Sequence, residues 1–113
     1  MLKFQDKMFA AGYCDARKAA FCAAATKLPK GKSGIVALCV KDDVLHIYEV
    51  DKRSNIGTPL FLVLLNRIEN LTIKATWLEP LLQFKYDGHL YSFTNFIGVK
   101  PALRVIEEES QKR

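Results

Sequence analysis

Four basic residues in two predicted loops carry the clearest chemistry of this sequence. Lys30 and Lys32 precede a predicted strand, and Lys52 and Arg53 lie in a polar loop further along the chain. Lysine and arginine side chains bind phosphate and carboxylate groups through charge-assisted hydrogen bonds. These four residues are therefore the candidate ligand-binding set, for a small anionic ligand. Ordinary solvated loops are the alternative interpretation of the same residues.

No other group of residues predicts a reaction, a metal site or a cofactor. His46 and His89 lie on separate predicted strands, with no second ligand at the spacing of a metal site. Gly31-Lys32-Ser33 is similar to the end of a phosphate-binding loop, but Thr26 occupies the position of the required first glycine. No serine–histidine–aspartate or cysteine–histidine set can be assembled. We expect a non-enzymatic protein without a cofactor.

The cysteine pattern and the terminal sequence indicate a cytoplasmic protein. The chain has three cysteines, Cys14, Cys22 and Cys39, and no pair has the C-x-x-C spacing. Cysteines among apolar neighbours are usually buried thiols without a redox or metal role. The first residues lack the apolar segment of a secretory signal. Apolar runs such as Leu60–Leu65 are far shorter than the roughly 18 residues of a membrane span.

The positive charge of the chain is concentrated near its N-terminus. The formal net charge is +5, and residues 1–33 hold seven Lys or Arg against two Asp. Residues 34–113 are balanced, with ten basic and ten acidic side chains. A strand region without surplus positive charge disfavours nucleic-acid binding. We interpret the N-terminal surplus mainly as a contribution to solubility.

The N-terminal part of the chain predicts helices. Residues 3–11 have one apolar face, and Asp15 is a suitable N-cap for a helix that runs to Lys27. Alanines recur along it at three- and four-residue spacing, which gives a flat face of small side chains. Such a face allows close approach of the sheet or of a second copy of the chain. The candidate interface residues are Ala16, Ala20, Ala23 and Trp77. A residue that closes the core is the alternative interpretation of Trp77.

Beyond Gly34 the hydrophobic period changes from that of a helix to two, which predicts strands. Lys41-Asp42-Asp43 is expected to form a tight turn, and Asp87-Gly88 is a strong signal for a type I′ hairpin turn. The six predicted strands cover Ile35–Val40, Val44–Val50, Pro59–Leu65, Asn70–Trp77, Leu82–Tyr86 and Leu90–Phe93.

Two of the later segments support more specific expectations. Pro59–Leu65 is continuously apolar, which predicts burial on both faces or a strand bent across two sheets. A helix is expected to begin near Pro101, since proline is favoured in the first helical turn. Its apolar residues, Ala102, Leu103, Val105 and Ile106, would face the sheet.

This order of elements resembles the bacterial pleckstrin-homology-like (GRAM-like) domains. The resemblance rests on the Val-Leu-His-Ile-Tyr strand (44–48), on the segments 64–71 and 87–93, and on the helix from Pro101 to Glu108. It implies an α+β fold, an antiparallel β-barrel or pair of nearly orthogonal sheets with a C-terminal capping helix. We expect this domain over residues 33–113, after an N-terminal helical extension over residues 1–32. The family fold has seven strands, so the seventh would lie in residues 1–14 or 53–58, or be replaced by the N-terminal helix.

The resemblance also implies a class of function. Members of this family are not enzymes; they bind lipid headgroups, peptides or other subunits through variable loops. Phosphoinositide-binding members place Lys and Arg in and beside the first hairpin loop. The first predicted hairpin here contains Asp42 and Asp43, whose carboxylates would repel a phosphate. Protein–protein association, including homo-oligomer formation, is therefore the main expectation. Binding of a lipid headgroup or small anion through Lys30, Lys32, Lys52 and Arg53 is the alternative.

Overall fold

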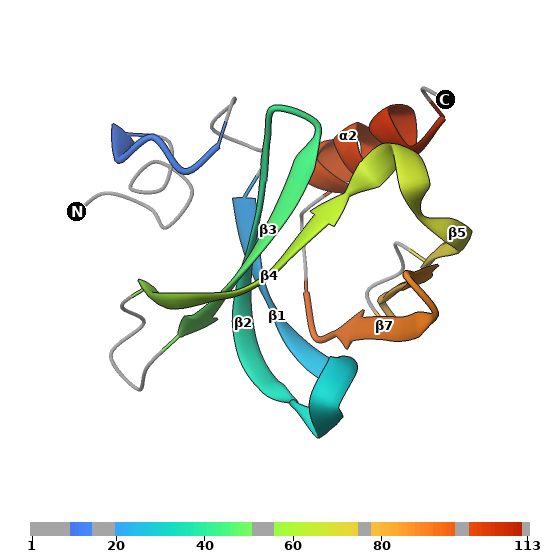
Figure 1. Cartoon of the computed structure of the whole chain (residues 1–113), viewed down its shortest axis with the longest axis horizontal. Helices are drawn as coiled ribbons and strands as arrows, with labels where there is room; N and C mark the ends of the chain where they lie inside the picture. The colour runs from blue at the N-terminus through green and yellow to red at the C-terminus, as the bar shows by residue number, and fades with distance from the viewer. Residues whose placement is uncertain (1–9, 15–19, 51–55, 75–77, 97–99, 112–113) are drawn as a thin grey trace.

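The computed structural model describes residues 10–14, 20–50, 56–74, 78–96 and 100–111. Within these residues the chain forms a mainly antiparallel β structure followed by one α-helix (Figure 1). The elements in chain order are β1 (Ala20–Lys27), η1 (Pro29–Gly31), β2 (Gly34–Lys41), β3 (Val44–Val50), β4 (Ile56–Leu64), η2 (Leu65–Arg67), β5 (Glu69–Lys74), β6 (Leu81–Tyr86), β7 (His89–Thr94) and α2 (Lys100–Ser110).

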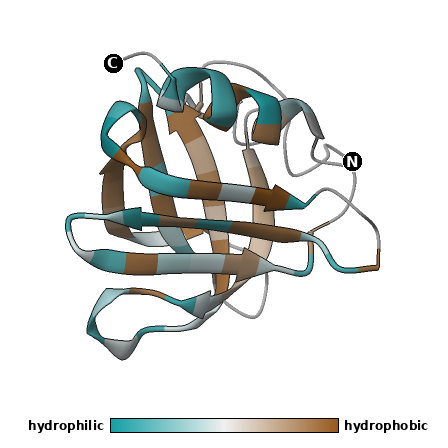
Figure 2. Cartoon of the chain, turned by 90° about the vertical axis from the view of Figure 1, so that its right-hand side faces the viewer, coloured by the Kyte–Doolittle hydropathy of each residue, from teal (hydrophilic) through white to brown (hydrophobic). Residues whose placement is uncertain are grey.

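The described strands form one seven-stranded antiparallel sheet with the order β4-β3-β2-β1-β7-β6-β5. β1 lies between β2 and β7 and so joins the two halves of the sheet. The two ends of this order, β4 and β5, have one strand neighbour each among the described strands. The sheet is therefore open, and the expectation of a closed barrel is wrong. The two halves fold over a shared core, and α2 lies across one end (Figures 1 and 2).

β1 corrects the prediction of a helix from Asp15 to Lys27. Residues 20–27 form a strand, which is also the seventh strand that the sequence did not locate. Phe21, Ala23 and Ala25 alternate as buried residues, but the residues between them are apolar too, so the period of two is hidden. Backbone pairing with β2 and β7 outweighs the helix propensity of alanine. The N-terminal helix predicted over residues 3–11 lies almost wholly outside the described residues.

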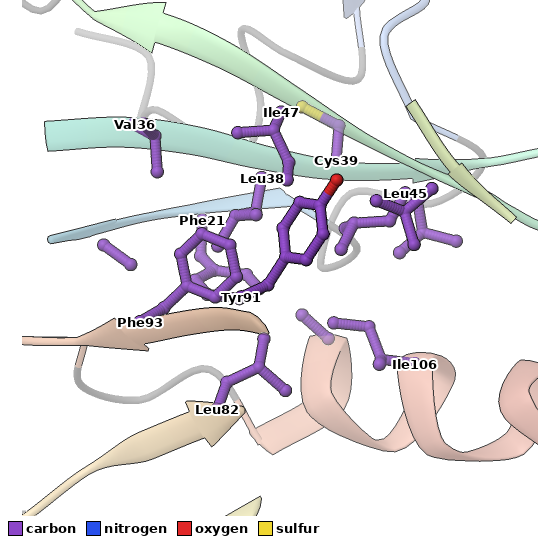
Figure 3. Close-up of a cluster of buried hydrophobic side chains, with 14 of the residues drawn as sticks. Phe21, Val36, Leu38, Cys39, Leu45, Ile47, Leu82, Tyr91, Phe93 and Ile106 are labelled. Atoms are coloured by element: carbon purple, nitrogen blue, oxygen red, sulfur yellow. The ribbon is translucent and has the colours of Figure 1, made fainter. Parts of the chain in front are cut away.

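The core lies between the two halves of the sheet and under α2. Side chains from β1, β2 and β3 face those of β6, β7 and α2 across it (Figure 3). Tyr91 on β7 lies opposite Phe84 on β6, and their rings stack with centroids 5.0 Å apart. The largest fully buried side chains are Phe84, Phe93, Leu38, Leu45, Ile47, Leu65, Ile68, Leu82, Ile106, Val36 and Val63.

α2 begins close to Pro101, as the sequence predicts. Its buried residues Ala102, Leu103 and Ile106 lie on one face at helical spacing, and Arg104 is exposed on the other. The buried face packs mainly on η2 and β2. The helix thus covers apolar core that the open sheet leaves at this end. No helix within the described residues is long and apolar enough to cross a membrane.

Both predicted tight turns are confirmed by their backbone angles. Asp42 and Asp43 have φ of 54° and 64°, and Asp87 and Gly88 have φ of 52° and 78°. Positive φ at both central residues is the mark of the type I′ turn, whose twist matches that of the flanking strands. The Leu65 amide donates a hydrogen bond to the Asp43 carbonyl oxygen at 3.1 Å, which ties the β2–β3 turn to η2.

β4 departs from the expectation of burial on both faces. Val63 is its only buried residue, and Leu62 and Leu64 are 58% and 38% exposed. The strand is the last of the sheet order, so one face and one edge have no covering element among the described strands. The apolar residues of β4 therefore lie partly in the core and partly on the exposed surface.

Residues 10–14 lie against β2 and β3. The Lys41 ammonium donates a hydrogen bond to the Gly12 carbonyl oxygen at 2.7 Å, and the rings of Tyr13 and Tyr48 meet edge to face. Cys14 and Cys39 are buried there, as the sequence predicts. Burial raises the pKa of the Cys39 thiol, and the neighbouring thiols of Cys14 and Cys22 raise it further.

Candidate anion-binding site

The loop between β1 and β2 is held by its own apolar residues. Leu28 and Pro29 are buried, so the start of the loop is anchored to the core. Lys30 and Gly31 then adopt left-handed conformations, with φ of 63° and 70°. The Lys32 amide donates to the Pro29 carbonyl oxygen at 3.5 Å and closes the turn. The loop backbone is thus compact, and it presents Lys30 and Lys32 as exposed side chains.

A groove of about 400 Å³ lies between this loop and the start of β7. Three lysines line it, Lys27 from the end of β1 and Lys30 and Lys32 from the loop, and His89 lines it from β7. No Asp or Glu occurs among the described residues that line the groove. The remaining lining residues are Thr26, Leu28, Pro29, Gly31, Ser33 and Leu90.

The electrostatics of this groove favour a negatively charged ligand. Three ammonium groups around one concave surface repel each other, and a bound anion would relieve that repulsion. Each lysine offers three N–H donors, and the Ser33 hydroxyl adds one more. The Thr26 hydroxyl is already used, because it donates to the Ser92 carbonyl oxygen at 3.2 Å. A phosphate, with several acceptor oxygens, matches this set of donors.

A second, smaller groove shares two residues with the first. Lys32 and Ser33 also line a space of about 230 Å³ that extends towards β3 and β4. Its other lining residues are mainly apolar, and they include the carboxylate residue Glu49. Lys32 therefore stands between a basic groove and a groove that contains an acid. The basic groove is the one suited to an anion.

The structure assembles part of the predicted ligand set and adds residues to it. Lys30 and Lys32 line the same groove. Lys52 and Arg53 lie outside the described residues. Lys27 and His89 were not predicted as ligand residues. Lys27 was missed because it was placed at the end of a helix, and His89 was missed because its partners lie on other elements.

The predicted interface residues are not assembled into a surface in the described structure. Ala20 and Ala23 are buried in β1, with exposures of 0% and 2%, so they belong to the core. The small-residue helix face that they were expected to form is absent at these positions because the segment is a strand. Ala16 and Trp77 lie outside the described residues.

The position of β1 also changes which loop is the first hairpin. The sequence prediction assigned that place to Lys41-Asp42-Asp43, and the two aspartates argued against phosphate binding. In the structure the first hairpin is β1–β2, and its loop covers residues 28–33. This loop contains two lysines and no acid. Asp42 and Asp43 therefore lie in the second hairpin, between β2 and β3.

No group of three or more His, Cys, Asp or Glu side chains within the described part of the chain is arranged to hold a metal ion. The three cysteines are not joined in a disulfide. Cys22 is half-buried, and burial raises the pKa of its thiol. A raised pKa keeps a thiol protonated and unreactive at neutral pH. Burial likewise raises the pKa of the Cys39 thiol.

Comparison with known proteins gives a match in structure and none in sequence. No protein-family model matches the chain, and no curated protein matches it. Among solved structures, the chain is similar to the crystal structure of the pleckstrin homology domain of ArhGAP27, with a TM-score of 0.58 and 13% sequence identity. The alignment covers 81% of this chain and 97% of that domain. The chain therefore has a pleckstrin-homology-like fold, here with an open seven-stranded sheet and one C-terminal helix.

Proposed function

We propose that this protein is a non-catalytic binding module whose β1–β2 loop binds a phosphate-bearing anion. The observation that carries the proposal is the groove lined by Lys27, Lys30, Lys32 and His89, without a carboxylate among its described lining residues. The fold supports a binding role, since it is that of the pleckstrin homology domain.

The left-handed conformation of Lys30 is a second reason to place the binding site in the β1–β2 loop. A non-glycine residue with positive φ costs of order 1–3 kcal/mol, and such residues cluster at binding sites. Glycine would adopt this conformation without that cost. A lysine at this position is consistent with selection for its charge. The buried residues Leu28 and Pro29 anchor the loop backbone, which places Lys30 among the residues that line the groove.

The ligand chemistry can come from a lipid headgroup or from a soluble phosphate, and one experiment separates them. Protein is incubated with phosphatidylcholine vesicles, with or without phosphatidylinositol bisphosphate, and flotation is measured at low salt. Inositol hexakisphosphate in solution is titrated in parallel by calorimetry. We expect binding in at least one arm, weakened as salt screens the charges. Binding to the soluble probe alone identifies a free phosphate ligand, and binding to vesicles alone identifies a membrane.

Charge-reversal variants test the site itself. Lys30→Glu and Lys32→Glu should each weaken binding about tenfold or more, which corresponds to about 1.4 kcal/mol. Arg104→Glu is the matched control, because it changes net charge equally on α2, at the other end of the molecule (Figure 1). The proposal is wrong if neither probe binds, or if all three variants bind equally well.

Self-association is a second candidate, and the exposed edge of β4 is the observation that favours it. The nine residues of β4 carry no charged side chain, and Leu62 and Leu64 are exposed. Charges, prolines and bulges prevent pairing at the edge strands of monomeric proteins. In β4 the proline, Pro59, and the irregular pairing lie in its first half, so the segment Leu60–Leu64 is the part available for pairing. Two copies could pair through β4 in antiparallel fashion. Sedimentation velocity over a wide concentration range should then show a dimer, and Leu62→Lys should abolish it. A monomer at all concentrations contradicts this candidate.

A further inference from the structure

His89 differs from the lysines of the basic groove in that histidine can change its charge near neutral pH. A histidine side chain gains or loses its proton between about pH 5 and 8, whereas a lysine stays protonated throughout that range. His89 is the first residue of β7, is exposed, and lines the groove together with Lys27, Lys30 and Lys32. The total charge of this groove therefore depends on the pH of the solution.

Strand pairing brings His89 to the lysine-containing loop. β1 and β7 are antiparallel neighbours, and Lys27 near the end of β1 lies opposite Ser92. The chain that continues from Lys27 into the loop therefore runs towards the start of β7, where His89 lies. η1, which contains Lys30, lies against β7 (Figure 1). The imidazole and the ammonium groups thus border the same groove.

The other charged and titratable groups beside His89 belong to types that keep one charge state in weak acid. Tyr86 lies opposite His89 on β6, Lys85 lies opposite Leu90, and Asp87 is in the turn between β6 and β7. Between about pH 7.5 and 5.5 a tyrosine hydroxyl is neutral, a lysine is positive and an aspartate is negative. Among the described residues in and beside the groove, His89 is therefore the one expected to change its charge.

A proton on His89 and an anion in the groove favour each other. In the free protein, an imidazolium adds a fourth positive charge beside three ammonium groups, which is unfavourable. In the complex, the same imidazolium attracts the anion, and both of its ring nitrogens can donate hydrogen bonds. The two binding events are linked, so each strengthens the other by the same factor.

We propose that His89 makes anion binding in the basic groove depend on pH, so that the affinity rises as the solution becomes weakly acidic. The lysines attract the anion at every pH in this range, and the imidazolium adds to them in acid. From about pH 7.5 to 5.5 the affinity should gain about threefold to tenfold from His89, as expected for one added charge close to an exposed anion. Since the groove is that of the proposed function, this role of His89 rests on that function.

Variants of His89 test the proposal on the full chain. Binding is measured at about pH 7.5 and 5.5, by calorimetry with inositol hexakisphosphate and by flotation with phosphatidylinositol bisphosphate vesicles. Phosphate monoesters lose negative charge near pH 6, but this affects all variants equally, so the ratio of two variants reports the protein. Relative to the parent, His89→Gln should bind equally at the higher pH and about threefold to tenfold more weakly at the lower pH.

Two further variants serve as controls. His89→Lys carries a fixed charge, so it should match the parent at the lower pH and bind more tightly than the parent at the higher pH. His46→Gln removes the other histidine of the chain, which lies on β3 and is not among the described residues that line the groove. It should bind like the parent at both pH values, and unchanged melting temperatures should confirm that all three variants fold.

The outcomes separate this proposal from the proposed function. If neither probe binds the parent at either pH, the proposed function is wrong and the role of His89 falls with it. If a probe binds and the ratio of His89→Gln to the parent is the same at both pH values, the proposed function stands and the role of His89 is wrong. An equal acid-dependent loss in His46→Gln would also overturn the role of His89.

The linkage has a second measurable consequence. Saturation with inositol hexakisphosphate should raise the midpoint of the His89 ring titration, followed by NMR, by about 0.5 to 1 pH unit, which is the logarithm of the same factor. The midpoint of His46 should stay in place. A purely structural role of His89 would leave both midpoints in place, and an unmoved His89 midpoint in the saturated complex would overturn the proposal.

Discussion

Ala23 on β1 lies opposite Val36 on β2, and both side chains are buried in the core. This pairing places an alanine-rich segment in the middle of the sheet, between β2 and β7. It also makes the lysine-containing loop the first hairpin of the fold. The exposed helix face expected from the alanine spacing and the buried strand found here predict different responses to mutation.

Ala23→Lys should destabilise the protein by about 3 kcal/mol or more, because it forces a charge into a packed core. Urea unfolding followed by circular dichroism measures the loss. Ala11→Lys is the matched control, since Ala11 is exposed and its replacement should change the free energy of unfolding by no more than about 0.5 kcal/mol. Equal, small effects of the two substitutions would contradict the position of Ala23 in the sheet.

Lys30→Gly should separate stability from binding. Glycine adopts positive φ without steric cost, so this variant should be as stable as the parent or more stable by up to about 1 kcal/mol. It should nevertheless bind the phosphate probe more weakly, since an ammonium group is lost. Lys32→Gly is the comparison: Lys32 has an ordinary extended backbone, so glycine there should lower stability by about 0.5–1 kcal/mol. Thermal unfolding and calorimetric titration of both variants measure the two quantities.

Ile106→Asp should destabilise the protein by several kcal/mol, because Ile106 is fully buried between α2 and the sheet. Arg104→Asp on the exposed face of the same helix should have an effect below about 1 kcal/mol. Both substitutions place an aspartate on α2, and Arg104→Asp makes the larger change in net charge, so a larger loss for Ile106→Asp reports its burial. A similar midpoint of urea unfolding for the two variants would show that α2 does not pack on the core.

Stability should fall as the solution becomes alkaline, because burial raises the pKa of the Cys39 thiol. In the unfolded chain a thiol loses its proton above about pH 8.5, whereas the buried thiol retains it. The folded state then binds more protons, so the free energy of unfolding decreases by about 1.4 kcal/mol per pH unit for one such thiol. Below this range the contribution is fully present.

Urea unfolding between about pH 7.5 and 9.5 measures this slope. Burial also raises the pKa of the Tyr48 and Tyr91 hydroxyls above 10.0, so both tyrosines stay protonated in the folded state over that range. Cys39→Ala should reduce the slope, and the part that remains should come chiefly from Cys22, whose pKa is also raised. A slope that is the same with and without Cys39 would exclude this residue as the cause.

The sequence by itself determined the features that depend on neighbouring residues. The two type I′ turns follow from Asp42-Asp43 and Asp87-Gly88. Aspartate tolerates positive φ because its side chain is short and polar, and glycine tolerates it because it has no side chain. The start of α2 follows from Pro101, whose fixed φ suits the first helical turn. The alternating patterns located β3, β5 and β6 because one face of each strand is more buried than the other, and the Asp87-Gly88 turn located β7 as the return strand of its hairpin.

Only the tertiary structure decided the features that depend on distant partners. β1 is a strand because β2 and β7 supply its hydrogen bonds. The spacing of the alanines along the sequence does not indicate which strands will lie beside them. The exposure of Leu62 follows from the position of β4 at the end of the sheet order. The basic groove requires Lys27, Lys30 and His89 to meet from separate elements. The sequence shows that these residues are basic, but long-range strand pairing is what brings them to the same groove.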